Sequence, residues 1–337
     1  MKQTQTNGKF DFSAGAKNAI HICLGLRPDE RITIIGGDEC SDIINALVAQ
    51  VEKVGSECSV VYLENYCERP CLDLPHDILV DMKKSQVSLY VAHALPGELN
   101  HRSQVTRFVT VHHMRHGHMV NISPEIMMQG MRADFRKVDE LSVRLIEKAR
   151  QTKVIRATTP AGTDIEAHFS PKLNWLKTSG IISEKKWGNL PGGEILTSPA
   201  RIDGVFVVDG VIGDYLCDIY GDLRKTPLTI EIEDSRIKSL KCDNELLVKD
   251  FSDYTAVDEN ANRVGEFAIG TNIGVHDIIG NILQDEKIPG IHIAFGDPYW
   301  EHTGQDWSSL AHIDCVGREF TIWMDDEMVM NGGKFLI

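Results

Sequence analysis

Short β-branched runs alternate with amphipathic stretches over residues 31–92, and this alternation restricts the possible folds more than any other feature of the chain. Strands are predicted over 31–35, 58–63 and 87–92. Between them, apolar residues with helical spacing predict helices over 43–51, ending at Gly55, and over 76–84. Strands that alternate with helices predict an α/β domain with a doubly wound, mostly parallel sheet. The Gly36-Gly37 turn lacks the full dinucleotide fingerprint, so no dinucleotide cofactor is expected there.

The character of the sequence changes near Thr152, after a helix predicted over 135–151. Short β-rich runs then precede turn-forming pairs, which predicts antiparallel hairpins. These pairs are Asp209-Gly210, Asp234-Ser235 and Asp325-Asp326. We therefore expect an N-terminal α/β domain over 1–152 and a β-rich α+β domain over 153–337.

The formal net charge of −14 over 337 residues makes nucleic acids and anionic membranes poor partners, because both require a basic patch. No stretch approaches the roughly 18 apolar residues of a membrane-spanning helix. The polar segment Met1–Asn7 does not resemble a secretory signal.

Eight cysteines are scattered along the chain. Cys67 and Cys71 lie four residues apart, but no second close pair completes a four-cysteine zinc site. Free thiols in a reducing cytoplasm are therefore expected. Cys315 follows Asp314 directly, so on a strand it would point to the opposite face, into the core.

Four short segments of the C-terminal half concentrate carboxylates and imidazoles. They contain Glu194, Glu266, His292, and the pair His312 and Asp314. On a strand, side chains two residues apart share a face, so His312 and Asp314 can reach one ion. Histidine and carboxylate are the usual ligands of zinc, iron, manganese and cobalt. Five such side chains exceed the needs of one tetrahedral zinc, which favours two ions sharing a bridging carboxylate or water.

These segments resemble the aminopeptidase T family of metallo-aminopeptidases, also called the thermophilic metalloprotease family. Residues 158–164 (TTPAGTD) are similar to the family's T-x-x-G-T-D turn, and 189–195 (NLPGGEI) to its N-x-P-G-G-E-V segment. Gly265-Glu266, His292 and His312-x-Asp314 follow in the family's order. Several separated motifs in one order are far more specific than any one of them.

The resemblance implies a site for two divalent ions, with zinc, cobalt or manganese expected. Its ligands would be Glu194, Glu266, His292, His312 and Asp314. The resemblance also implies that Tyr299 is catalytic and donates a hydrogen bond to the developing oxyanion. The reaction would be cleavage of an amide bond by a metal-activated water, releasing an N-terminal residue from a small peptide. We further expect a cytoplasmic homodimer.

Two other functions stay open. The chain looks shorter than typical peptidases of the family, and its shorter relatives include 2,5-dihydroxypyridine dioxygenases, which bind one Fe(II) through two histidines and an aspartate. His292, His312 and Asp314 alone would supply that set. Retention of all five side chains favours the dinuclear hydrolase. A non-catalytic metal-binding or scaffold protein is the third alternative.

Several residues also have simpler interpretations. His312 and Asp314 could form a structural hydrogen bond, and Tyr299 could pack against its aromatic neighbours. A further cluster could form a metal site, a substrate-binding edge or a polar loop, and it consists of His112, His113, His116 and His118. His276 and His302 could orient a ligand or the substrate.

Overall fold

The computed structural model describes residues 10–337, and their contacts divide them into two units. Unit 1 contains the described residues up to Arg136 together with Gly180–Gly192. Unit 2 contains Lys137–Ser179 and Gly193–Ile337. The predicted division near Thr152 stays a prediction. The segment Met1–Asn7, for which we expect no secretory signal, lies outside the described residues.

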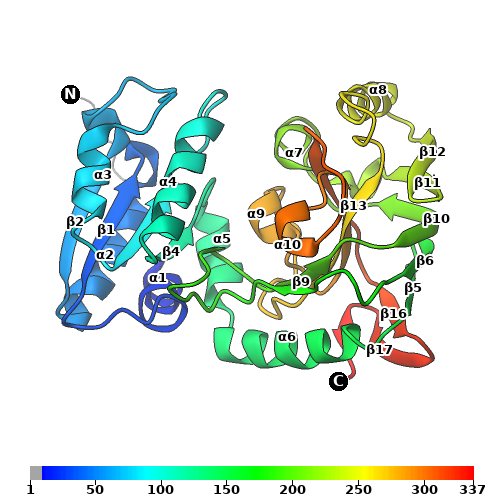
Figure 1. Cartoon of the computed structure of the whole chain (residues 1–337), viewed down its shortest axis with the longest axis horizontal. Helices are drawn as coiled ribbons and strands as arrows, with labels where there is room; N and C mark the ends of the chain where they lie inside the picture. The colour runs from blue at the N-terminus through cyan, green and yellow to red at the C-terminus, as the bar shows by residue number, and fades with distance from the viewer. Residues whose placement is uncertain (1–9) are drawn as a thin grey trace. The chain divides into compact units, whose positions relative to one another are not determined.

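Unit 1 is built on a five-stranded parallel sheet with the strand order β2-β1-β3-β4-β8 (Figure 1). The strands are β1 (Arg31–Gly36), β2 (Glu57–Tyr62), β3 (Val87–Val91), β4 (Arg115–His118) and β8 (Gly188–Asn189). The α-helices are α1 (Ser13–Lys17), α2 (Ser41–Val54), α3 (His76–Met82), α4 (Leu99–Val111) and α5 (Pro124–Met128), and a π-helix covers Asn18–Cys23. The predicted α/β fold with a mostly parallel N-terminal sheet is confirmed.

Local sequence accounts for these elements. Every residue of β3 is buried, as expected for an inner strand covered on both faces. Helix α2 buries one apolar stripe, including Ile43, Leu47 and Val51. It ends at Gly55, whose φ of 82° lies in the left-handed region that favours glycine.

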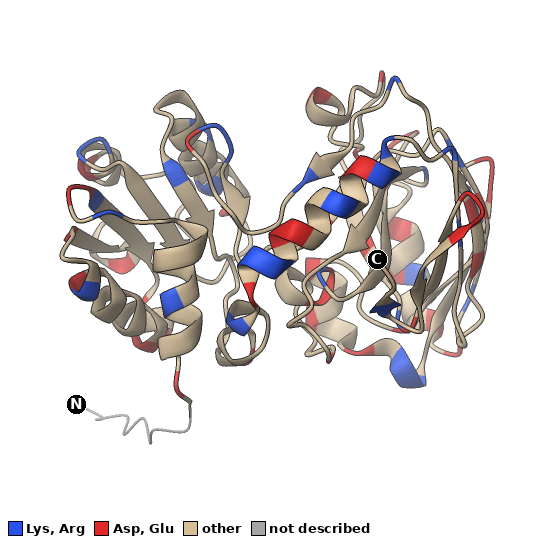
Figure 2. Ribbon diagram, turned by 90° about the horizontal axis from the view of Figure 1, so that it is seen from below, with Lys and Arg blue, Asp and Glu red and all other residues tan. Residues whose placement is uncertain are grey.

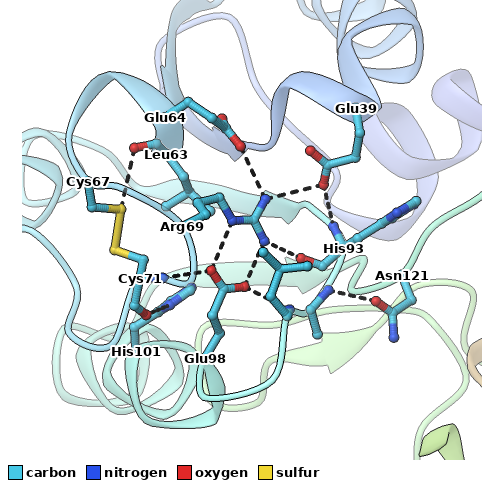
Figure 3. A network of polar contacts seen from close by, with 12 residues as sticks. Glu39, Leu63, Glu64, Cys67, Arg69, Cys71, His93, Glu98, His101 and Asn121 are labelled. Atoms are coloured by element: carbon cyan, nitrogen blue, oxygen red, sulfur yellow. Dashed lines mark hydrogen bonds and ion pairs between the residues drawn. A yellow bond between two sulfur atoms is a disulfide. The ribbon is translucent and has the colours of Figure 1, made fainter.

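An ion cluster centred on the largely buried pair Arg69 and Glu98 connects the loops after β1, β2 and β3 (Figure 3). The Arg69 guanidinium donates to both oxygens of Glu98, at 2.9 and 2.7 Å. It also donates to Glu64 at 3.2 Å and to Glu39 at 3.4 Å. The Glu98 side chain is fully buried, and it accepts two backbone N–H bonds in addition. The Arg69 side chain therefore connects several loops of unit 1.

Cys67 and Cys71 flank this cluster and form a disulfide (Figure 3). The prediction that all cysteines are free is therefore wrong for this pair, because the intervening loop turns back and brings the two Cα atoms to 5.9 Å. The six other cysteines are free, and Cys315 lies in the core as predicted.

Unit 2 contains two mainly antiparallel sheets. The larger has the strand order β12-β11-β10-β6-β5-β16-β17-β18, and the smaller has the order β15-β14-β13-β9-β7. The larger sheet consists of β5 (Val154–Thr158), β6 (Asp164–His168), β10 (Arg201–Val208), β11 (Leu228–Glu233), β12 (Arg236–Lys241), β16 (Thr321–Met324), β17 (Glu327–Asn331) and β18 (Lys334–Phe335). The smaller sheet consists of β7 (Leu176–Lys177), β9 (Glu194–Thr197), β13 (Val264–Gly270), β14 (Gly290–Gly296) and β15 (His312–Val316). The helices are α6 (Phe135–Ala149), α7 (Asp214–Tyr220), α8 (Glu245–Tyr254), α9 (Ile282–Asp285) and α10 (Trp300–Thr303).

One apolar core joins the two sheets of unit 2, and it includes Ile155 and Phe206 from the larger sheet and Phe267 and Ile293 from the smaller. Helix α6 adds Leu145 to this core. Basic and acidic residues alternate along the rest of α6 in the view of Figure 2. No described helix is long and apolar enough to cross a bilayer.

Two of the three predicted hairpins form. The turn at Asp234-Ser235 joins β11 to β12, and that at Asp325-Asp326 joins β16 to β17. The hairpin predicted at Asp209-Gly210 is wrong. Residues 210–213 instead bond to β15, with Gly213 N donating to Asp314 O at 2.8 Å, and the chain forms α7 before it returns as β11.

Candidate metal centre

The register of the smaller sheet places all five predicted ligand side chains on one face. Directly opposed residues of antiparallel strands point to the same side, and alternate residues of a strand do too. The paired residues include Ala294 with Glu266 and with Asp314, Ala268 with His292, Gly296 with His312, and Gly270 with Glu194. The residues between these ligands on the same strands belong to the apolar core, among them Phe267, Ile293 and Ile313.

A β-bulge positions Glu266. The register between β13 and β14 shifts from Val264 to Glu266, which leaves Gly265 as the extra residue. A Cβ atom at Gly265 would lie 2.0 Å from Gly296 O, so only glycine allows the two strands to approach this closely. The residues directly opposite Glu266 and His292 are small and buried, namely Ala294 and Ala268.

The side chains converge on two groups that share Glu266. His292 Nε2 lies 3.5 Å from Glu194 Oε2 and 3.4 Å from Glu266 Oε1. His312 Nε2 lies 3.7 Å from Glu266 Oε2 and 3.6 Å from Asp314 Oδ1. Ligands about 2.1 Å from a tetrahedral ion lie roughly 3.4 Å from one another, so these separations suit metal coordination. The two oxygens of Glu266 thus face different imidazoles, as those of a bridging carboxylate would.

An unsatisfied polar atom also fits a metal ion. Within the described part of the chain, the buried Glu266 Oε2, which faces His312, has no hydrogen-bond partner. A buried carboxylate oxygen without a donor is costly, and a cation would compensate it. Three groups in the described residues could hold an ion: Glu194, Glu266 and His292; Glu266, His312 and Asp314; and Glu286, His292 and Asp314.

The carboxylates and imidazoles of the cluster strongly shift the pKa values of one another. Burial opposes a charge on His312, but the carboxylate of Asp314 outweighs it and raises the pKa of the imidazole to about 10. His292 is likewise buried, yet Glu266 and Glu194 raise its pKa to about 9. Burial alone would raise the pKa of Asp314, but His312 lowers it to about 2. A metal ion at these imidazoles would replace their protons.

Tyr299 lies beside this cluster. Its ring centroid is 4.6 Å from that of His312. Its φ of 51° is unusual for a bulky residue, and such strain is common at functional sites. Desolvation and the carboxylates of Glu266 and Asp314 raise the pKa of the phenol well above its usual range, so the hydroxyl is a hydrogen-bond donor at neutral pH.

Two charged residues of the site were not anticipated from the sequence. Lys287 is 2% exposed, and its ammonium lies 2.7 Å from Glu194 Oε1 and contacts Glu286. Burial, together with the carboxylates of Asp314 and Glu194, raises the pKa of Glu286 to about 8. Both residues follow the short helix α9 and carry no strand or helix periodicity, so no pattern in the sequence indicated them.

Among the described residues, none of the remaining histidines belongs to a candidate metal group. His112 and His113 are exposed in the turn after α4, whereas His116 and His118 are buried on β4. His116 Nδ1 lies 2.8 Å from Ser88 Oγ, and its Nε2 lies 3.1 Å from His118 Nδ1. The four residues therefore do not form one site. His276 and His302 are exposed.

Comparison with known proteins gives a family and a shared fold. The family model described as thermophilic metalloprotease (M29) matches residues 136–317, which is more than half of the chain. Wild-type AmpT from Thermus thermophilus has a similar fold, with a TM-score of 0.68 at 17% identity, covering 97% of this chain and 99% of that one. A 2,5-dihydroxypyridine dioxygenase from Pseudomonas putida KT2440 has a TM-score of 0.67 at 14% identity, covering 96% of both chains. At these identities the likeness shows the fold alone. No curated protein matches the sequence.

Proposed function

The chain belongs to the thermophilic metalloprotease (M29) family, and from that premise we propose that it is an aminopeptidase-type hydrolase, which cleaves the amide bond after the N-terminal residue of a small peptide. The observation that carries this proposal is the carboxylate of Glu266, which is shared between two groups of ligand side chains. Such an arrangement suits two divalent ions about 3–4 Å apart.

Glu194, Glu266 and His292 would hold one ion, and Glu266, His312 and Asp314 the other. When bound, the ions would supply a water of lowered pKa and polarise the scissile carbonyl. Zinc, cobalt or manganese are the expected metals. The metal identity, a homodimeric state and a cytoplasmic location stay predictions.

The protein's own groups would handle the charge and the proton. The hydroxyl of Tyr299 would donate a hydrogen bond to the carbonyl oxygen as it becomes an oxyanion. A carboxylate oxygen of the cluster would accept the proton of the attacking water and return it to the leaving amine. Aspartate and glutamate in this cluster can also bind the cationic α-amino group of a peptide, which would select substrates with a free N-terminus.

The geometry weighs against the dioxygenase alternative. A mononuclear iron site of that type needs two imidazoles and one carboxylate around a single ion. Within the described residues, each of the three candidate groups contains one imidazole, either His292 or His312. The Fe(II) set of His292, His312 and Asp314 is therefore the weaker proposal.

A peptide assay under nitrogen tests the proposed function. The protein is loaded with zinc, cobalt or manganese and incubated with short peptides, with N-acetylated copies of the same peptides as matched controls. We expect release of the N-terminal residue from the free peptides, no release from the acetylated ones, and no need for oxygen. Oxygen-dependent ring cleavage of a dihydroxypyridine, with no peptide hydrolysis, would instead support the dioxygenase.

A further inference from the structure

The residue Lys287, which follows α9, contacts a carboxylate of the candidate metal centre. Lys287 is 2% exposed, although burial of a lone ammonium is costly. Its backbone is anchored on both sides, because its N–H donates to Gln284 O at 2.8 Å and its carbonyl accepts from Asn272 N at 3.1 Å. The side chain is therefore directed at its two carboxylate partners, Glu194 and Glu286, by a fixed backbone.

The two carboxylate oxygens of Glu194 have different partners. Oε1 accepts from Thr178 Oγ1 at 2.6 Å and lies 2.7 Å from Lys287 Nζ. A carboxylate oxygen has about two lone-pair sites, so these two donors occupy Oε1. Oε2 is the oxygen that faces the imidazole of His292, at 3.5 Å. Glu194 consequently has one oxygen to offer an ion.

From this arrangement we infer that Lys287 is a positioning residue of the metal centre, which together with Thr178 orients Glu194 so that it binds an ion through Oε2 alone. The inference rests on the proposed function only in requiring that the cluster binds metal. Side chains that hold ligands in place commonly contribute 10–100-fold to metal affinity.

Thr178 contacts the same oxygen of Glu194 as Lys287 does, and it can be changed independently. Its backbone is paired with the start of β9, since Thr178 N donates to Glu194 O at 3.0 Å and Gly193 N donates to Thr178 O at 2.7 Å. Its hydroxyl is a neutral donor to the oxygen that the ammonium also contacts. Loss of either donor would free Oε1, but only loss of Lys287 would also change the local charge.

This difference separates positioning from charge compensation. If Lys287 mainly neutralises the surrounding carboxylates, its removal makes the centre more negative and strengthens cation binding. If it mainly orients Glu194, its removal weakens binding and alters the coordination of the ion. The two roles therefore predict opposite signs for the change in metal affinity.

Cobalt(II) titration of the metal-free, full-length protein tests the inference. The variants are Lys287→Met, Thr178→Val and the control Lys249→Met, which removes an exposed lysine whose side chain is 67% accessible. Affinity is measured by competition with a chromophoric chelator at fixed pH, and the visible spectrum of the bound cobalt reports its coordination. Thermal melts of the metal-free proteins check folding.

We expect cobalt affinity to fall 10–100-fold in Lys287→Met and in the same direction in Thr178→Val, with an altered cobalt spectrum in both and no change in Lys249→Met. Unchanged or tighter binding in a folded Lys287→Met would overturn the inference. If that variant does not fold, Thr178→Val decides, and wild-type affinity and spectrum there would overturn it. Wild-type protein that binds cobalt but hydrolyses no peptide would refute the proposed function while leaving this inference intact.

Discussion

Arg69 offers a sharp test of how unit 1 is stabilised. Its side chain is 9% exposed, and it forms a two-bond contact with the fully buried carboxylate of Glu98 (Figure 3). The substitution Arg69→Met keeps much of the apolar stem and removes all the donors. Among the described residues, the N–H groups of Cys71 and Leu95 would then be the hydrogen-bond partners left to the buried Glu98 charge.

Removal of one partner from a buried ion pair typically costs about 3–5 kcal/mol. The two remaining backbone donors to Glu98 place the expected loss near the lower end of that range. A double variant, Arg69→Met with Glu98→Gln, removes both charges and should be more stable than Arg69→Met alone. The exposed pair Lys249–Asp253, with side chains 67% and 65% accessible, is the control, and Lys249→Met should change stability by less than about 0.5 kcal/mol.

Hydrogen exchange read by mass spectrometry is the suitable assay, because it reports local unfolding segment by segment. The loss of protection in Arg69→Met should appear in peptides from β3 and α4, and protection in unit 2 should be unchanged. If Arg69→Met showed the same protection of β3 and α4 as the wild type, or if the double variant were less stable than the single one, the argument from an uncompensated buried charge would fail.

Three further results are expected. Tyr299→Phe keeps the ring against His312 and removes the donor, so turnover should fall about 10²–10³-fold in steady-state kinetics at unchanged metal content; near-normal turnover would make the tyrosine a packing residue. His312→Ala and Asp314→Ala should each abolish activity and lower the metal content found by elemental analysis, with circular dichroism unchanged; full activity in either would refute the assigned site. Burial opposes the charge of Glu98, but Arg69 lowers its pKa from 4.5 to about 2. The stabilisation from this carboxylate should therefore be complete above about pH 4.5 and lost as the pH falls toward 2. Acid unfolding of Glu98→Gln should lack this loss of stability between pH 4.5 and 2, and an acid transition identical to that of the wild type would contradict the role given to Glu98.

The N-terminal sheet was predictable because its elements follow from local patterns. Buried β-branched runs and the apolar stripe of α2 each lie within one continuous segment. The sequence also predicted which five side chains would come together in unit 2, for another reason. These are Glu194, Glu266, His292, His312 and Asp314. They lie on strands, where a period of two fixes the face of each side chain, and they follow the order of a family motif.

Other features depend on contacts between distant segments. Lys287 looks like any surface lysine until its ammonium is seen between Glu194 and Glu286. The segment after Asp209 looked like a hairpin turn, but it bonds to β15, about a hundred residues later in the chain. The spacing of Cys67 and Cys71 permitted a disulfide without requiring one, because the loop between them sets the distance.

The number of ions per chain tests the central claim most directly, because the shared carboxylate of Glu266 is what distinguishes a dinuclear centre from a mononuclear one. Crystals of protein loaded with zinc, measured on both sides of the zinc absorption edge, would show the ions by anomalous scattering. We predict two peaks per chain, about 3–4 Å apart, on either side of Glu266. A single peak under metal-replete conditions, bound by His292, His312 and Asp314, would contradict the account.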